Sequence, residues 1–387
     1  MLKILNFVLL LIFFIAYFPA KAHAVVDPLA SANNKFGIHI LFTSELEAAS
    51  RLVNSNGGDW GYVTIPIQAT DRDIEKWQKF MDDARKYRII PVIRIASENY
   101  FFDTKVWRKP KDFDVLDFAN FLNSLDWPVK NKYVIILNEV NRSDEWQGEP
   151  NPGEYAQILD YAVTAFKSVN EDFFIISAGL DNGAANSKTS IDQYNFMTQM
   201  EEEVPGIFGR IDGLASHSYP NPGFSQPPWV ETTRSISSFK FERSLAENLG
   251  GKKLPVFITE TGWSRHILSG SKIASYMQYA FEEVWSDEGV VAVTPFILNA
   301  GGPYAQFSLI DENGSRNEVY LAIEKLPKTK GEPVPESAKI DSFSRKEDLS
   351  SVVFPKINQY SDNESNLDKT MIAVAFIKWF FKSLNVL

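Results

Sequence analysis

Two glutamates in this sequence lie directly after apolar runs, where burial of an ionised carboxylate costs free energy. Glu139 lies in the segment Ile-Ile-Leu-Asn-Glu-Val-Asn, and Glu260 lies in Phe-Ile-Thr-Glu-Thr-Gly-Trp. A carboxylate that follows buried residues loses hydration, so it must be hydrogen-bonded or used in chemistry. If both converge on one substrate, one can attack as a nucleophile while the other serves as general acid and then general base. The two segments therefore predict paired-carboxylate chemistry, provided that the fold brings them together.

The elements that would position these residues are eight short apolar runs separated by amphipathic stretches. Most runs are apolar at nearly every position, which is typical of parallel strands covered by helices on their outer face. Their ends lie about 25 to 45 residues apart, which leaves room for one crossover helix in each interval. The runs are residues 36–41, 61–67, 89–95, 133–137, 173–178, 211–216, 255–259 and 290–298.

The stretches between the runs have helical periodicity and begin with Ser, Asp or Pro. They include residues 44–53, 71–87, 112–125, 152–169 and 271–285. Eight such units predict an α/β fold, a (β/α)8 TIM barrel over residues 25–326. A doubly wound open sheet is the competing fold, but it would usually carry a Gly-rich phosphate fingerprint after the first strand, and residues 37–43 contain none.

A barrel of this kind carries its chemistry at the carboxyl ends of the strands, and those positions hold polar residues here. They are His39, residues 64–68, Arg94, Asn138, Glu139, residues 178–181, His217, Tyr219, Glu260 and Asn299.

These motifs resemble clan A of the glycoside hydrolases, the retaining (β/α)8 enzymes. Asn138-Glu139 is similar to the clan's Asn-Glu signature after strand four, and Glu260 in Ile-Thr-Glu-Thr-Gly-Trp is similar to its nucleophile motif after strand seven. His217-Ser-Tyr219-Pro is similar to the clan's His-x-Tyr element, and residues 307–314 resemble the segment after strand eight. The resemblance covers about residues 35–326 and implies a retaining glycoside hydrolase that cleaves O-glycosidic bonds.

The resemblance also implies roles for individual residues. Glu139 would be the acid/base, protonated at rest because burial and a neighbouring carboxylate raise its pKa. Glu260 would be the nucleophile, and its carboxyl group would lie about 5–5.5 Å from that of Glu139. The residues expected to bind substrate or hold the nucleophile are Asn138, which would orient the sugar 2-hydroxyl, and His217, Tyr219, Arg94, His39, Trp263 and Asn299.

The sequence departs from the clan in two places. Many members carry Trp at the end of strand eight, whereas residues 295–299 read Pro-Phe-Ile-Leu-Asn. The clan's Arg near the nucleophile often comes from strand two, and here Arg94 on strand three would replace it. Trp107 and Trp146 lie in presumed loops, where exposed indoles would suit sugar subsites.

Two other classes of protein stay open. The first is a non-catalytic carbohydrate-binding barrel at the cell surface, although such a protein would be expected to have lost a carboxylate and both are present. The second is a barrel enzyme of other chemistry, such as a phosphate-binding isomerase or a metal-dependent hydrolase. A metal hydrolase would be expected to carry a His-x-His motif on strand one, and the segment His39-Ile-Leu lacks that motif. Gly301-Gly302 indicates a turn, because no matching Gly-rich loop follows the seventh run.

The amino-acid composition excludes several classes of binding partner and of catalytic site. The 387 residues include 39 Lys and Arg against 49 Asp and Glu, a net charge of −10, which argues against nucleic acid as a partner. There is no cysteine, which excludes disulfides, thiolate nucleophiles and cysteine zinc sites, and four histidines argue against a multi-histidine metal centre. We therefore expect no cofactor and no metal. The resemblance to clan A implies an oligo- or polysaccharide substrate.

The two ends of the chain indicate targeting. Lys3, the apolar run 4–18 and Ala22-His-Ala24 predict a secretory signal peptide over residues 1–24, the alternative being an uncleaved anchor. The protein is therefore expected to be exported, as an extracellular or envelope-associated protein. Residues 327–369 predict a flexible linker, and 370–387 an apolar helix that could span the membrane, lie at its surface or fold back on the barrel.

Overall fold

The computed structural model describes residues 25–100 and 103–336. The predicted signal peptide, the C-terminal apolar helix and all of the predicted linker beyond residue 336 lie outside the described residues. Within the described ranges, no helix has the length and apolar character needed to cross a membrane.

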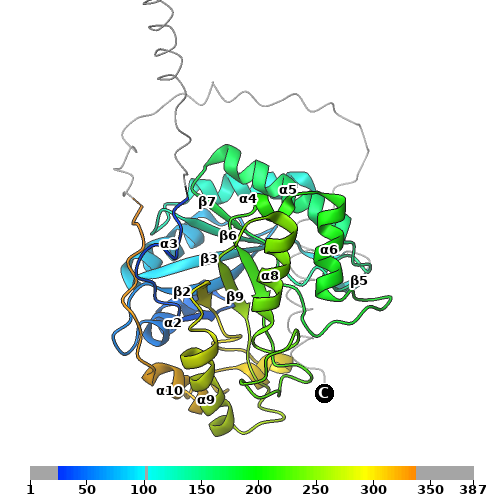
Figure 1. Ribbon diagram of the computed structural model, residues 1–387. Helices are drawn as coiled ribbons and strands as arrows, with labels where there is room; N and C mark the ends of the chain where they lie inside the picture. The colour runs from blue at the N-terminus through cyan, green and yellow to red at the C-terminus, as the bar shows by residue number, and fades with distance from the viewer. Residues whose placement is uncertain (1–24, 101–102, 337–387) are drawn as a thin grey trace, which may run out of the picture. The chain divides into compact units, whose positions relative to one another are not determined.

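Eight parallel strands of the described residues pair into a closed ring. Helices α4 (Asp112–Ser124), α5 (Pro152–Val169) and α6 (Gln193–Glu203) lie outside these strands (Figure 1). Five pair in the order β1-β2-β3-β6-β7 and three in the order β10-β9-β8. Parallel bridges from Phe36 to Val293 and from Ile176 to Gly213 join the two sheets at both seams. The ring strands are β1 (Gly37–His39), β2 (Gly61–Gln68), β3 (Ile89–Ala96), β6 (Lys132–Ile136), β7 (Phe173–Ile176), β8 (Leu214–His217), β9 (Val256–Glu260) and β10 (Val290–Val293).

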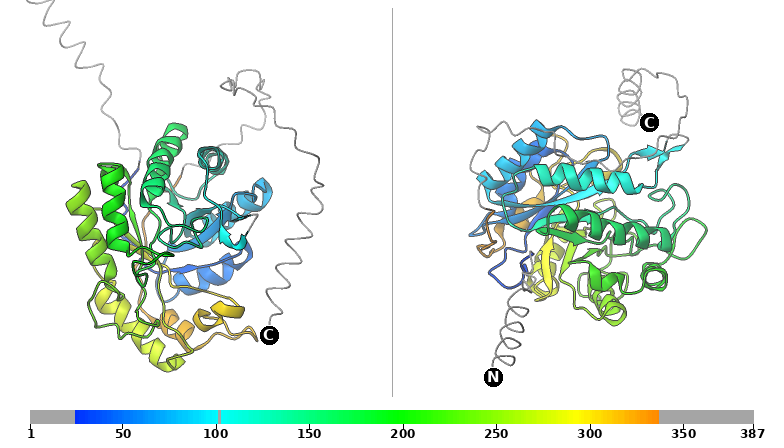
Figure 2. Two further views of the ribbon diagram at one scale, coloured as in Figure 1. Left: turned by 90° about the vertical axis from the view of Figure 1, so that its right-hand side faces the viewer. Right: turned by 90° about the horizontal axis from the view of Figure 1, so that it is seen from above.

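Helices surround the strands (Figure 2). Several begin where a polar side chain caps the first turn: Asp73 accepts from the Lys76 amide, and Asn151 accepts from the Glu154 amide ahead of Pro152. The helices are α2 (Leu46–Val53), α3 (Ile74–Tyr87), α4 (Asp112–Ser124), α5 (Pro152–Val169), α6 (Gln193–Glu203), α7 (Ile207–Arg210), α8 (Ser238–Gly250), α9 (Gly270–Tyr279) and α10 (Glu318–Lys325). Shorter turns of helix are η1 (Thr43–Glu45), η2 (Ala280–Val284) and η3 (Gly302–Phe307).

An antiparallel hairpin of β4 (Asn99–Tyr100) and β5 (Asp103–Trp107) extends the loop after β3. No sequence pattern predicts this hairpin, because both strands are short and carry no apolar alternation.

The apolar residues form two cores. A large one lies between the strands and the helices, as the unbroken apolar runs predict. A smaller one fills the interior of the ring with Tyr62, Tyr133, Phe174 and Phe257, and Val25 and Leu29 pack against it. The interior is therefore a packed core, and the open end is the one formed by the carboxyl ends of the strands.

The last strand is shorter than the sequence predicts. The apolar run 290–298 continues past β10, but Phe296 N donates to Thr261 O and Leu298 N donates to His39 O, outside the strand ladder. The Phe296–Ile297 peptide bond is cis. Ile297 and Leu298 are buried in this irregular segment, which explains why the sequence pattern is strand-like there.

The first ten residues of the predicted linker are ordered by contacts with the barrel. Gly331 N donates to Asp59 O, Lys130 N donates to Val334 O, and the buried Lys132 ammonium lies 3.2 Å from a Glu336 oxygen. Residues 327–336 therefore belong to the folded unit, and their Pro- and Lys-rich composition does not reveal it.

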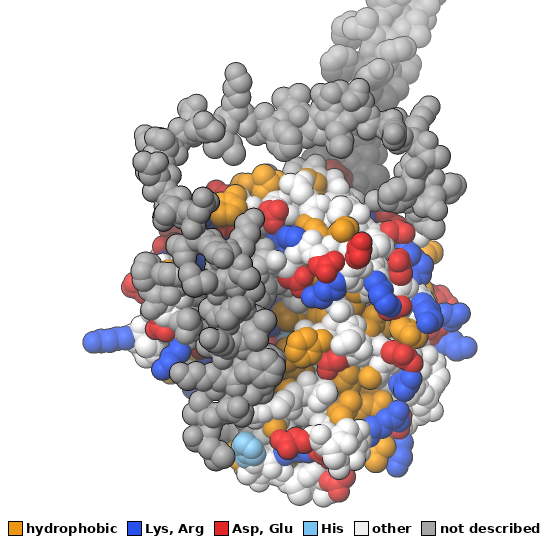
Figure 3. All heavy atoms as spheres, turned by 180° about the vertical axis from the view of Figure 1, so that it is seen from behind, with side chains coloured by type: hydrophobic (Ala, Val, Ile, Leu, Met, Phe, Trp, Pro, Cys, Tyr) orange, Lys and Arg blue, Asp and Glu red, His pale blue; other side chains and the backbone are white. Residues whose placement is uncertain are grey.

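On the face drawn in Figure 3, basic and acidic side chains are interspersed.

Candidate active site

The carboxyl ends of the strands surround a cavity of about 530 Å³. One part of its wall is charged, with Arg94, Lys105 and Arg142 beside several carboxylates. Another part is aromatic and includes Trp107, Tyr219, Phe224, Phe296, Tyr304 and Phe307. Glu139 and Glu260 both line the cavity, so the fold brings together the two carboxylates that the sequence singles out.

Glu139 is held in the cavity by an unusual backbone. Directly after β6, Leu137 has φ +72° and Glu139 has φ +37°, the left-handed region that non-glycine residues seldom adopt. The Glu139 amide donates to Gly179 O over 2.9 Å, and Glu139 O accepts from the Arg142 amide over 2.9 Å. Such backbone strain clusters at functional sites, where the surrounding structure maintains it.

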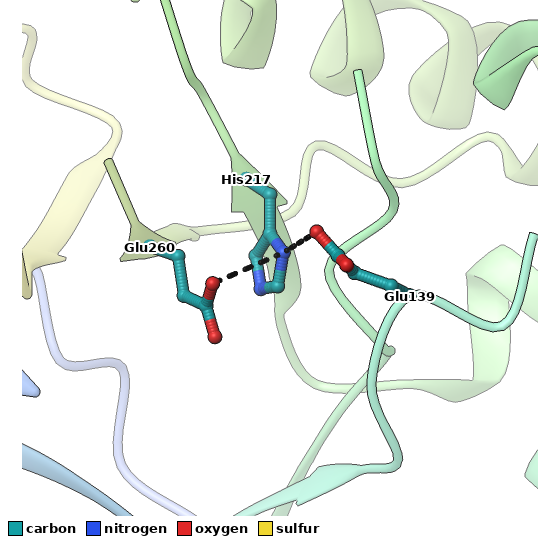
Figure 4. Close-up of side chains that lie close together, drawn as sticks. All are labelled: Glu139, His217 and Glu260. Atoms are coloured by element: carbon teal, nitrogen blue, oxygen red, sulfur yellow. Dashed lines mark hydrogen bonds and ion pairs between the residues drawn. The ribbon is translucent and has the colours of Figure 1, made fainter. Parts of the chain in front are cut away.

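The Glu139 carboxylate has two partners with donor nitrogens. His217 Nδ1 lies 3.0 Å from Oε1 (Figure 4). Arg142 Nη1 donates to Oε2 over 3.0 Å. Burial raises the pKa of Glu139, but His217, Arg142 and Arg94 together lower it by a larger amount. The net pKa of Glu139 therefore lies below the usual value. The prediction that Glu139 is protonated at rest is therefore wrong for the unliganded site, because the hydrogen bond from His217 and the nearby positive charges outweigh the effect of burial.

His217 occupies the space left by a glycine. A Cβ on Gly179 would lie 2.2 Å from His217 Cδ2, so only glycine leaves room for the ring. The ring is 1 % exposed, and its Nδ1 also lies 3.8 Å from Glu260 Oε2 (Figure 4). Burial lowers the pKa of His217, but Glu260 and Glu139 outweigh this effect and the net pKa is raised.

Glu260, the last residue of β9, is held by donors on both oxygens. The Tyr219 hydroxyl donates to Oε2 over 3.1 Å, and Arg94 Nη1 donates to Oε1 over 3.2 Å. Arg94 thus contacts the nucleophile candidate from strand β3, as the sequence analysis expects. The two hydrogen bonds fix the orientation of the Glu260 carboxylate at the edge of the cavity.

His39 lies behind Glu260 instead of on the cavity wall. It is 0 % exposed, and its Nδ1 lies 3.7 Å from Glu260 Oε1. Neither ring nitrogen has a hydrogen-bond partner among the described residues. Burial lowers the pKa of His39 well below its usual value, so the ring is neutral. The predicted substrate contact is not available from this position.

Asn138 is fixed at both ends of its amide. Its Oδ1 accepts from Arg94, and its Nδ2 donates to Glu145 Oε1 over 3.2 Å. Sequence reasoning missed Glu145, which lies in a loop with no apolar run before it. This carboxyl lines the cavity, and burial together with the charge of Glu139 raises its pKa to about 7.

Of four further residues considered for substrate contact, three tryptophans and Asn299, only Trp107 lines the cavity. Trp107 lines the cavity, as expected for a sugar subsite. Trp146 is 1 % exposed, and Trp263 is 2 % exposed with its indole N–H donating to Gln226 O, so neither presents a face to the cavity. Asn299 is exposed and does not line the cavity, because the chain leaves the ring after Val293.

Glu139, His217 and Glu260 are also the residues of metal-ligand type that come together in the described ranges. One oxygen of each carboxylate and a ring nitrogen lie within 4.8 Å of one another. Arg94 and Arg142 already donate to these carboxylates, and their charges oppose a further cation. The cluster is therefore better suited to proton transfer and nucleophilic attack than to metal binding.

The fold is similar to that of clan A glycoside hydrolases with known structures. A family 39 glycoside hydrolase from the gut symbiont Bacteroides cellulosilyticus WH2 aligns with TM-score 0.54 and 15% identity over 78% of this chain and 64% of its own length. A GH39 beta-xylosidase from Caulobacter crescentus aligns with TM-score 0.54 and 15% identity over 76% of this chain and 72% of its own. A GH5_18 protein from Streptomyces cattleya, in complex with Manb1-4GlcNAc, aligns with TM-score 0.51 and 15% identity over 76% and 80%.

This chain thus spans less than two thirds of the first of these structures. No protein-family model matches the sequence, and no curated protein matches it. At these identities the likeness establishes the fold, which is the clan's TIM-barrel fold that the motifs predict.

Proposed function

We propose that this protein is a retaining glycoside hydrolase in which Glu260 is the nucleophile and Glu139 is the acid/base. The observation that carries the proposal is the short distance between the two carboxylates, which have oxygens within 4.8 Å of each other. Retaining enzymes hold their carboxyl groups about 5–5.5 Å apart, whereas inverting enzymes leave about 6.5–9.5 Å for a water molecule.

The reaction would proceed by double displacement. Glu260 attacks the anomeric carbon while Glu139 donates a proton to the departing glycosidic oxygen, so that one C–O bond forms as the other breaks. Glu139 then takes a proton from water, and the hydroxide displaces Glu260 from the sugar. Tyr219 and Arg94 donate hydrogen bonds to the two Glu260 oxygens and orient the carboxylate for the first step.

The cavity favours an oligo- or polysaccharide substrate. Its aromatic wall can stack on the C–H faces of sugar rings, and its charged wall can accept and donate hydrogen bonds to hydroxyls. Two of the similar structures bear on the class of ligand: one is called a beta-xylosidase and another holds the disaccharide Manb1-4GlcNAc.

The two glutamates should fail in different ways when they are replaced. Glu260→Ala should abolish turnover of every glycoside, and added azide should restore some activity and give the inverted sugar azide. Glu139→Ala should cripple substrates with poor leaving groups by about 10²–10⁴-fold. It should spare activated aryl glycosides, and azide should then give the retained product. Inverted azide product from Glu139→Ala would mean that the roles are exchanged.

A non-catalytic glycan-binding barrel is the alternative that this experiment also tests. If the wild type retains glycans on an affinity matrix but releases no reducing sugar from a panel of oligo- and polysaccharides, the hydrolase proposal is wrong.

We also propose that the protein is exported and associates with the cell envelope, on the basis of residues 1–24 and 370–387. Removal of residues 370–387 should move the protein from the membrane fraction to the soluble fraction. A full-length protein that is already wholly soluble at low and high salt would contradict the anchor.

A further inference from the structure

The hydrogen bonds of Glu139 in the unliganded site favour its ionised form, whereas the proposed role as general acid requires the protonated form. A general acid must carry a proton when the glycosidic bond breaks, yet Glu139 accepts hydrogen bonds from His217 and Arg142, both of which favour the ionised carboxylate. Arg142 cannot release a proton at any pH of interest. His217 can, because imidazole titrates in the physiological range.

The geometry between His217 and Glu139 suits direct transfer. Nδ1 lies 3.0 Å from Glu139 Oε1, within hydrogen-bond reach. The ring is fully enclosed, with Gly179 against one side and the Tyr219 ring edge-on at 6.4 Å between centroids, so its orientation is fixed.

Charged groups on several elements surround the ring and set its protonation. Glu260 on β9 approaches Nδ1 to 3.8 Å and favours the imidazolium, as does Asp181 after β7. Glu242 on α8 adds to this effect only where it is ionised, because burial raises its pKa to about 7. Arg94 on β3 disfavours it. His39 on β1 is neutral and adds no charge.

We propose that His217 stores the catalytic proton of the resting site and passes it from Nδ1 to Glu139 Oε1 when a glycoside is bound. This inference rests on the proposed function, because it assigns the source of the proton that Glu139 delivers.

The proton balance is complete within the site. The proton moves from Nδ1 to Oε1, which leaves the ring neutral; the new O–H group turns toward the substrate and protonates the glycosidic oxygen as Glu260 bonds to the anomeric carbon. In the second step Glu139 removes a proton from the attacking water and returns it to Nδ1. Each turnover thus restores the imidazolium and the ionised Glu139.

One consequence separates this arrangement from an isolated glutamic acid. For substrates with poor leaving groups, the fall of kcat/KM at high pH should follow the loss of the proton shared by His217 and Glu139. The pKa of His217 is raised above its usual value of 6.5, whereas a glutamic acid usually titrates near 4.5. The alkaline limb should therefore lie above pH 6.5.

The main test is the pH profile of His217→Asn, whose amide can hydrogen-bond Glu139 but cannot titrate. With an oligosaccharide, the alkaline limb of kcat/KM should move at least about one pH unit toward acid, since Glu139 must then hold its own proton. With an activated aryl glycoside, which needs little protonation, the loss in kcat/KM above the shifted limb should be smaller than the loss with the oligosaccharide. His266→Asn, outside the cavity, is the matched control and should keep the wild-type profile.

A second readout does not require turnover. The ¹⁵N signals of His217 should report a protonated ring at pH 6.5 in the wild type. In Glu139→Gln, the loss of the neighbouring charge should lower the pKa of the ring, because burial is then less opposed.

The outcomes are distinct. If the wild type hydrolyses glycosides but His217→Asn keeps the wild-type alkaline limb, or if the ring is neutral at pH 6.5, the proton-storage role is wrong. If His217→Asn slows both substrates equally at every pH, His217 has only a structural role. If the wild type hydrolyses no glycoside at all, the proposed function and this inference both fail.

Discussion

The buried carboxyl of Glu242 should make the stability of the protein depend on pH. Glu242 lies on α8, is 3 % exposed, and faces β8 from behind the active site. Burial raises its pKa to about 7, although hydrogen bonds from Ser238 and Ser216 oppose the shift. The folded protein therefore favours the protonated carboxyl, and ionisation above pH 7 costs free energy.

The size of this cost follows from the two pKa values. The ordinary pKa of 4.5 and the folded value of about 7 differ by about 2.5, and each unit corresponds to about 1.4 kcal/mol. The protonated carboxyl thus contributes up to about 3 kcal/mol to the free energy of unfolding. Because the folded pKa is the higher one, this contribution is complete below pH 4.5 and is lost as the pH rises through 7.

Glu242→Gln replaces the carboxyl with a neutral group of the same shape. We expect the variant to gain about 2.5 kcal/mol relative to wild type between pH 5 and pH 9, measured by urea unfolding at both values. Glu247→Gln, at an exposed position of the same helix, is the control and should show no such gain. If the difference between Glu242→Gln and wild type is the same at both pH values, Glu242 does not titrate near 7 and the reasoning is refuted.

Three further predictions concern the site and its support. Gly179→Ala should push the His217 ring away and cost about 1–3 kcal/mol of stability, with a loss of kcat on oligosaccharides; unchanged kinetics would contradict the packing described. Tyr219→Phe removes the donor to Glu260 and should lower kcat about 10- to 100-fold with little change in KM, measured by steady-state kinetics. Truncation after residue 336 should leave thermal unfolding of the barrel intact, whereas removal of residues 327–336 as well should lower the free energy of unfolding by at least about 3 kcal/mol, and equal stability would show that this segment is dispensable.

Much of the fold follows from local patterns in the sequence. The strands of a covered parallel sheet are apolar at nearly every position, and capped amphipathic helices follow them, so both leave a signal within ten or twenty residues. That is why each of the apolar runs overlaps a ring strand, although the run 36–41 is longer than β1 and the run 211–216 begins three residues before β8. The eighth run is misleading, because Ile297 and Leu298 are buried in an irregular segment that no local pattern distinguishes from a strand.

The main site residues were also predictable, since a barrel places strand ends on one face. Glu139 and Glu260 come at the ends of apolar runs, Arg94 lies near the carboxyl end of β3, and His217 and Tyr219 lie at and just after the end of β8. Their convergence needs only the topology of the fold.

What the tertiary structure alone decided are the properties that depend on neighbours distant in sequence. Glu139 is ionised at rest because His217, 78 positions away, and Arg142 lie against it, which reverses the protonation state that burial by itself predicts. Trp263 turns into the core although it follows the nucleophile candidate, and Glu145 enters the cavity from a loop without any pattern. The sequence by itself determined which residue types reach the open end of the barrel, because periodicity and strand order are local. The charges, donors and free space around each side chain arise only when separate strands meet, and these decide which residues can hold a proton or touch a sugar.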